Sequence, residues 1–147
     1  MLDLSLAIVH HLAIFALFSV LIMEIALVKR GMNRNTVITV VKVDLWYGIL
    51  AAMILIVGFS RAVYAAKGWA YYSHNGFFWA KMATFVAIGL LSVPPTLKYL
   101  HWKRLPQSPS DDKVDGVRAL LWIELGLFAL LPIFAAAMAR GYGEFPF

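Results

Sequence analysis

The sequence predicts an all-α integral membrane protein that folds as a four-helix bundle, and three observations support this prediction. Hydrophobic residues make up 62% of the 147 residues and charged residues only 14%, a composition outside the usual range of soluble domains. Four apolar runs fill most of the chain, each close to the ~20 residues that a helix needs to cross a hydrocarbon core. The positive charges lie mainly in two of the three segments that connect these runs.

The helices are expected at about residues 4–28, 43–66, 77–97 and 114–139. Asp3, with no Lys or Arg, precedes the first run, and no small-residue cleavage pattern follows it, so we interpret this run as a retained helix and not as a signal peptide. The longest polar interval is too short to form a soluble domain. Residues 1–147 therefore form a single membrane domain.

Turn-forming residues mark the expected helix ends. Ser110, followed by Asp111 and Asp112, is suited to an N-cap of the fourth helix. Three prolines, at 94, 95 and 132, should kink or end a helix unless neighbouring groups satisfy the freed carbonyls. The chain has no cysteine, which excludes disulfides, thiolate-ligated clusters and covalent c-type haem attachment.

The distribution of basic residues predicts the orientation in the membrane. Nine of the thirteen Lys and Arg residues fall in or beside the segments 29–42 and 98–118, and the positive-inside rule places such segments in the cytoplasm. Both termini and the loop 67–76 then face outward, which makes the protein N-out and C-out. The aromatic residues around this outer loop suit the membrane interface, or alternatively a lid over a site between the helices.

Ionisable residues collect at two levels, and intramembrane ionisable residues are candidates for functional sites. The outer level contains His10 and His11 of the first helix, about 10 Å into the membrane at 1.5 Å per residue, with Arg61 and Lys81 of the next two helices. His74 lies in the loop above. Asp3 and Glu144 lie only at the margin of this level, so its bases lack matching acids within the membrane.

Such a group of bases is suited to a metal or an anionic ligand, and haem b provides both, because iron binds an imidazole and the propionates bind basic residues. His10 and His11 are about 100° apart on a helix. Glu24 should share the face of His10, which favours His10 as the inward residue, whereas His11 remains open as a ligand. His74 or Lys81 is a candidate sixth ligand. Arg61 and Lys81, or a rim of Lys67 and Arg140, would neutralise the propionates.

The inner level differs because it contains charges of both signs. It comprises residues near the inner helix ends and one nearer the middle of the fourth helix: Glu24, Asp44, Lys98, Arg118 and Glu124. The economical interpretation pairs these acids with the nearby bases, since an unpaired buried charge is penalised by several kcal/mol. A functional interpretation is a proton path through Glu124 and Glu24.

The His near position ten, the stretch Trp79-Ala80-Lys81-Met82 and the basic end of the third helix resemble a known group of proteins. They are similar to a family of bacterial four-helix membrane proteins with a domain of unknown function, related to the haem-containing, HemJ-type protoporphyrinogen oxidases. The resemblance implies a multi-pass protein of the bacterial inner membrane, with haem b bound by His10 or His11 and an essential Lys81 nearby. The chain departs from the oxidase pattern in its adjacent histidines, so the resemblance implies haem binding more directly than porphyrinogen oxidation.

Two functions are therefore predicted. The first is a haem b membrane protein for electron transfer or oxidation of a membrane-soluble substrate, such as a quinone or a porphyrin-like molecule. The alternative is a non-enzymatic module that binds a metal ion, an anion or a partner protein at the outer cluster, with copper held by His10, His11 and His74 as one form. The expected partners also include the lipid bilayer and further copies of the chain in a homo-oligomer, whereas the placement of the positive charge argues against nucleic acid.

Overall fold

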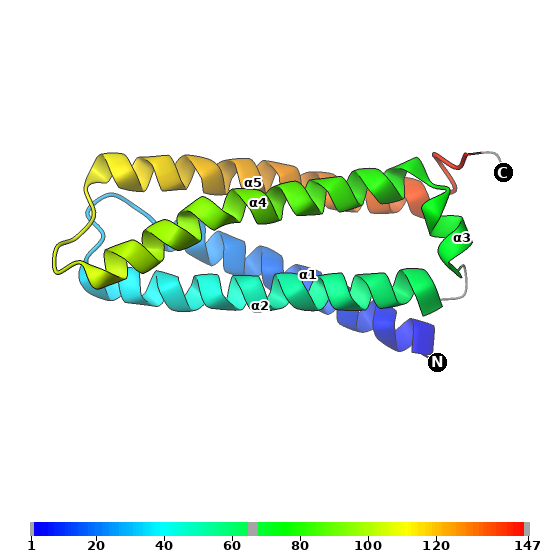
Figure 1. Ribbon diagram of the computed structural model, residues 1–147, viewed down its shortest axis with the longest axis horizontal. Helices are drawn as coiled ribbons and strands as arrows, with labels where there is room; N and C mark the ends of the chain where they lie inside the picture. Colours follow the sequence, from blue (N-terminus) through cyan, green and yellow to red (C-terminus); the bar gives the residue numbers. More distant parts are fainter. Residues whose placement is uncertain (1, 65–67, 146–147) are drawn as a thin grey trace.

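The computed structural model describes residues 2–64 and 68–145 and is all-α, with four long helices and one short one (Figure 1). The long helices are α1 (Leu2–Leu27), α2 (Arg34–Tyr64), α4 (Gly76–Arg104) and α5 (Asp111–Ala139). All four are long and apolar enough to cross a membrane. The predicted all-α class with four candidate membrane spans is confirmed.

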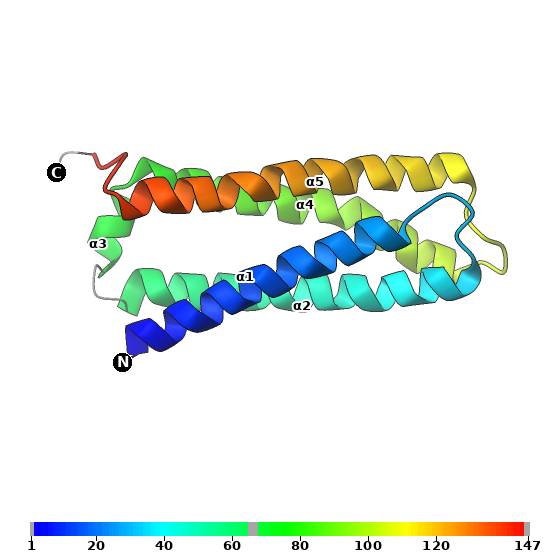
Figure 2. The same cartoon turned by 180° about the vertical axis from the view of Figure 1, so that it is seen from behind.

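The helices run alternately up and down, so that both connections 28–33 and 105–110 lie at one end and both termini lie at the other (Figure 1). We call these the basic end and the terminal end. Helix α1 packs mainly on α2, and α4 mainly on α5. Helix α1 crosses the bundle obliquely and comes close to α5 only towards the basic end (Figure 2).

Three helices are longer at the basic end than the sequence predicted, and for α5 the difference is small, since it begins at Asp111 instead of residue 114. Helix α2 begins at Arg34 instead of Val43, because the side chain of Asn33 accepts a hydrogen bond from the Thr36 backbone N–H at 2.9 Å and so caps the first turn. Helix α4 continues through Pro94 and Pro95 to Arg104 instead of ending near Leu97. Pro132 likewise lies inside α5. The first turns of α2 and the last turns of α4 are polar, so hydropathy alone does not predict them.

The predicted outer loop contains a short helix, α3 (Gly68–Ser73), at the terminal end. Its Trp69 ring lies 5.9 Å from Phe59 and 6.1 Å from Phe78, measured between ring centroids. The Asn75 side chain caps α4 by accepting hydrogen bonds from two backbone N–H groups, and it donates to Tyr142 O at 3.0 Å. These contacts attach α3 to the ends of α2 and α4, and they attach the segment around Tyr142 to the start of α4.

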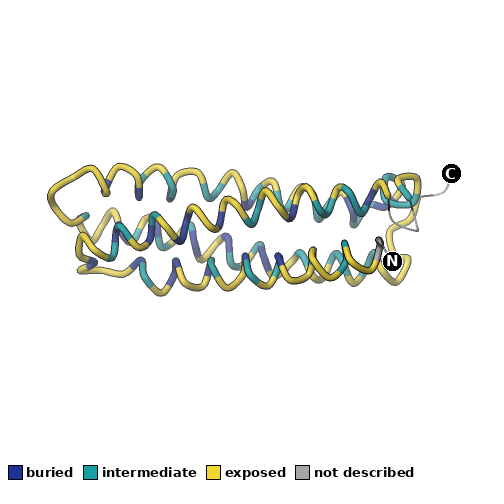
Figure 3. The backbone as a smooth tube through the Cα atoms, turned by 90° about the horizontal axis from the view of Figure 1, so that it is seen from below, coloured by how far each residue is buried: buried dark blue, intermediate teal, exposed yellow. Residues whose placement is uncertain are grey.

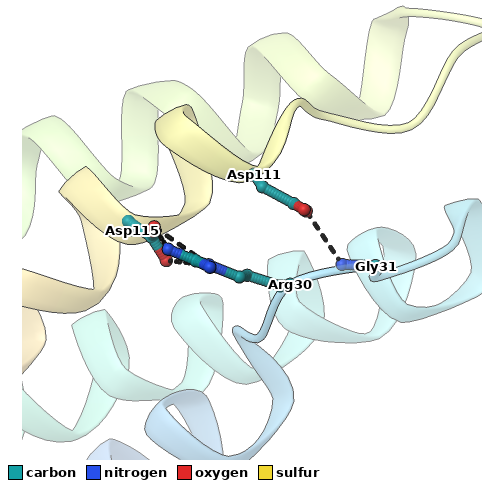
Figure 4. A network of polar contacts seen from close by, with 4 residues as sticks. All are labelled: Arg30, Gly31, Asp111 and Asp115. Atoms are coloured by element: carbon teal, nitrogen blue, oxygen red, sulfur yellow. Dashed lines mark hydrogen bonds and ion pairs between the residues drawn. The ribbon is translucent and has the colours of Figure 1, made fainter.

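At the basic end, the connection between α1 and α2 is tied to the first turns of α5 (Figure 4). The Arg30 guanidinium binds both carboxylate oxygens of Asp115, and the Gly31 backbone N–H donates to Asp111 at 3.1 Å. Hydrogen bonding to Asp115 raises the pKa of Arg30 above its ordinary value. Ser110 takes the predicted N-cap position of α5, although its side chain makes no capping hydrogen bond.

The apolar core is concentrated towards the basic end (Figure 3). In the described part of α1, no residue before Ala13 is buried, and in α5 no residue after Phe128 is buried. At the terminal end the buried side chains are limited, among the described residues, to Ala62, Asn75 and Phe78. The helices are therefore closely packed over the basic half and much less so over the terminal third.

Candidate functional site

Side chains of the predicted outer level lie close together between α1, α2 and α4. We call His10, Arg61 and Lys81 the basic cluster; all three are half-buried and lie in the sparsely packed terminal third. Arg61 and Lys81 are both close enough to His10 to act on it electrostatically, and Arg61 acts on Lys81. Among the described residues, every charge that acts on His10 or Lys81 in this way is positive.

His10 packs edge-on against α2 at a glycine. A Cβ atom built on Gly58 would lie 3.0 Å from His10 Cε1, closer than ordinary van der Waals contact, and 3.5 Å from Nδ1. The absence of a side chain at Gly58 therefore allows the imidazole to enter the α1–α2 interface. In the described part of the chain, His10 Nδ1 is buried without a hydrogen-bond partner, which is an uncommon and costly state for a polar atom inside a protein.

His11 has a different environment from its neighbour. Its side chain is exposed on the outside of the bundle, and its Nδ1 donates to Ala7 O of the preceding turn at 2.7 Å. The His10 and His11 rings are 6.2 Å apart at 90° to each other. This arrangement agrees with the inward orientation that the shared face with Glu24 favoured for His10.

His74 lies at the junction of α3 and α4, where it belongs to the local turn. Its Nδ1 donates to Ala70 O at 2.9 Å and lies 3.3 Å from the Ser73 hydroxyl. Within residues 2–64 and 68–145, no group of three or more His, Asp and Glu side chains could hold a metal ion. The three-histidine copper site considered from the sequence is therefore not formed. Lys67 of the predicted rim lies outside the described residues, and Arg140 caps the end of α5.

The predicted inner level also forms a group, but its composition differs from the expectation. Three carboxyl groups, which we call the acid cluster, come from three helices: Glu24 of α1, Asp44 of α2 and Glu124 of α5. Glu24 and Glu124 are only 2% and 1% exposed. Asp44 and Glu124 both act electrostatically on Glu24, so the three groups lie close together.

The prediction that these acids form ion pairs with Lys98 or Arg118 is wrong. Each carboxyl group instead accepts a hydrogen bond from a hydroxyl of another helix: Tyr99 to Glu24 at 3.4 Å, Thr96 to Asp44 at 2.8 Å, and Tyr47 to Glu124 at 3.2 Å. Sequence reasoning missed these three partners. A usable signal was present, because Tyr47 follows Asp44 by three residues and Tyr99 follows Thr96 by three, which places each pair on one helix face.

Arg118 has a structural role that the sequence did not reveal. Its guanidinium donates to Ile25 O at 2.9 Å and to Val28 O at 2.7 Å. These carbonyls lie in and just after the last turn of α1, where no intrahelical N–H is available. Arg118 therefore caps α1 from α5, because the last carbonyls of a helix carry a partial negative charge that attracts a guanidinium.

A groove between α2 and α4 reaches the acid cluster from outside the bundle. Its volume is about 390 Å³, and its lining combines the polar residues Asp44, Tyr47, Ser92 and Thr96 with apolar walls that include Leu45 and Ile49. Asp44 is the only carboxyl group of the acid cluster in this lining. The groove therefore connects the interior of the bundle with the surrounding apolar medium through one acid.

Comparison with known families agrees with the four apolar helices. The model of the family described as "Predicted membrane protein (DUF2214)" matches residues 2–143, nearly the whole chain. The chain belongs to this family. No curated protein and no solved structure matches it. For this DUF2214 protein, membership in an uncharacterised membrane family, expected from the sequence, is thus confirmed.

Proposed function

We propose that this DUF2214 protein binds haem b at the basic cluster and uses it for electron transfer or for the oxidation of a membrane-soluble substrate. The observation that supports this proposal most directly is His10, an imidazole with a buried, unpartnered Nδ1 held in the sparsely packed third of the bundle. A haem-ligating imidazole is a common use of histidine between the helices of a bundle.

The residues present fit such a cofactor. His10 provides one nitrogen ligand and does not require a cluster of further metal-binding side chains. Lys81 and Arg61 supply positive charge beside it, which suits the carboxylates of the haem propionates. A protonated Lys81 serves this role more easily than it would serve as an iron ligand, because a ligating amine must first lose its proton.

When bound, haem b would supply an iron that accepts or donates one electron at a time. The protein's own residues would hold and orient the cofactor: His10 against Gly58, and the two basic side chains at one edge. The exposed apolar surface of the helices admits substrates dissolved in the membrane, of the quinone or porphyrinogen class. A relationship to the HemJ-type oxidases would be consistent with haem held by His10 and two basic side chains.

We further propose that the basic end faces the cytoplasm of a bacterium and that the terminal end faces outward. The structure brings the two basic connections to the same end (Figure 1), and such segments are retained in the cytoplasm by the positive-inside rule. The proposed haem site would then lie in the outer part of the inner membrane.

The experiment compares absorption spectra, oxidised and dithionite-reduced, of wild type, His10→Ala and His11→Ala, each purified in detergent from haem-replete cells. We expect a Soret band and reduced b-type peaks that His10→Ala abolishes and His11→Ala retains, since His11 lies outside the bundle. Added imidazole should restore the band in folded His10→Ala protein. A featureless wild-type spectrum without iron would overturn the proposal and favour the binding module for an anion or a partner protein.

A further inference from the structure

The acid cluster lies away from the proposed haem site and is not used by it. Glu24 follows His10 by fourteen residues on the same helix, which separates the two groups by about 21 Å along the helix axis. The hydroxyl groups that face the three acids come from two helices, Tyr47 from α2 and Thr96 and Tyr99 from α4. These contacts are all uncharged.

The neighbouring bases lie beside other parts of the bundle. The Lys98 ammonium nitrogen lies 3.7 Å from the position that a Cβ on Gly116 would take, eight residues before Glu124 on α5. The Arg118 guanidinium binds the carbonyls of α1. Neither forms an ion pair with an acid of the cluster.

Two oxygen atoms of the cluster lack any partner. Within the described chain, Glu24 Oε1 and Glu124 Oε1 are buried and accept no hydrogen bond. Three carboxylates without a base would repel one another inside a low-dielectric bundle, and each would carry a desolvation cost of several kcal/mol. Binding a proton removes the charge, and it turns an unpartnered acceptor into a hydroxyl group.

A proton suits this arrangement better than a metal ion does. The three carboxyl groups act on one another electrostatically, yet no group of described His, Asp and Glu side chains is arranged to hold a metal ion. A metal ion needs several oxygens converging at about 2–2.6 Å, whereas a proton needs only one oxygen at a time.

We propose that Glu24, Asp44 and Glu124 form a proton-binding site inside the bundle, which exchanges its protons through Asp44 and the groove between α2 and α4. Asp44 connects the site with the groove because it belongs to both. The hydroxyl group that exchanges the proton belongs either to water in the groove or to a hydroxyl-bearing molecule dissolved in the membrane.

The test is infrared spectroscopy of the full-length protein in lipid nanodiscs, which detects the carbonyl stretching band of protonated carboxyl groups. At neutral pH we expect this band in wild type, and we expect Glu24→Gln and Glu124→Gln each to lose part of it. Asp115→Asn is the matched control. Asp115 is held as a carboxylate by Arg30, so removing this carboxylate should leave the band of protonated carboxyl groups unchanged. A wild-type spectrum without the band, or Gln variants that retain it fully, would overturn the proton site.

The exchange route through Asp44 and the groove is tested by the rate at which the carbonyl band shifts after transfer to D₂O. We expect a fast shift in wild type. Asp44→Asn should abolish the fast shift of the band that comes from Glu24 and Glu124. Gly48→Leu should do so as well by filling the groove, because a Cβ at Gly48 meets no atom within 4 Å. Gly126→Leu is the control, since residue 126 is equally open but does not line the groove.

Fast exchange in D₂O alone identifies water as the exchanging group, and exchange that requires an added short-chain quinol identifies a membrane-soluble hydroxyl. Unchanged rates in folded Asp44→Asn and Gly48→Leu protein would overturn the route. If either variant fails to fold, a pH titration of the wild-type band decides the proton site itself, because carboxylates that stay ionised to low pH would contradict it.

Discussion

The imidazole of His10 lies so close to Gly58 that a single methyl group at residue 58 would have to displace it. A Cβ atom there would approach His10 Cε1 to 3.0 Å. The other glycine of α2, Gly48, has no atom within 4 Å of its corresponding position. This difference between two glycines of one helix provides a controlled test of the proposed haem site.

Gly58→Ala should perturb haem binding, and Gly48→Ala should not. Alanine favours a helix by up to about 1 kcal/mol over glycine, so both variants should fold, but only the first moves the His10 ring. We expect a shifted or weaker Soret band per mole of protein for Gly58→Ala, measured at equal protein concentration. Identical spectra for the two variants would show that His10 is not the ligand.

Tyr47→Phe should destabilise the bundle through the acid cluster. The substitution removes the hydroxyl that donates to Glu124 Oε2 at 3.2 Å, and the other oxygen of this carboxyl already lacks a partner. Leaving a buried acceptor unpaired costs roughly 1–3 kcal/mol. Thermal unfolding in detergent should therefore show a lower midpoint than in Tyr64→Phe, whose ring is exposed; equal midpoints would argue against this hydrogen bond.

Arg118→Ala should weaken the attachment of α1 to α5. Its guanidinium satisfies two carbonyls at the end of α1, and we expect a loss of about 1–3 kcal/mol when these groups are left without a donor. Arg104→Ala, an exposed arginine at the same end, is the control. Proteolysis of the 28–33 connection provides a second measurement: it should become faster only in Arg118→Ala.

The proposed orientation can be measured with single cysteines because the chain contains none. Ser108→Cys places a thiol in the 105–110 connection, and Tyr142→Cys places one near the opposite end; both positions are exposed. In intact spheroplasts, an impermeant maleimide should label Tyr142→Cys, whereas Ser108→Cys should require disrupted membranes. The reverse pattern would show that the basic end faces outward.

The sequence was sufficient to predict the helices, their alternation and the two polar levels, because hydropathy and the cost of intramembrane charge both act locally along the chain. It was insufficient for the partners of the acids. Charge pairing suggested the nearby bases as partners of the acids, but Arg118 donates to carbonyls of α1 instead, and backbone carbonyls have no signature in residue types. The contact of His10 with Gly58 likewise depends on which helix faces are adjacent, and this information is absent from a single sequence.

The polar contacts between helices are unevenly distributed along the bundle, and this affects which parts can move. The two helical hairpins, α1–α2 and α4–α5, are held together at the basic end by the Arg30–Asp115 pair (Figure 4) and by the hydrogen bonds from Arg118 to the end of α1. At the terminal end, α3 links α2 to α4 through Trp69, whereas in the described part of α1 no residue before Ala13 is buried. The outer part of α1 is therefore the element that can move away from the bundle at the level of His10. A flat molecule can enter there while the acid cluster, nearer the basic end, keeps its geometry.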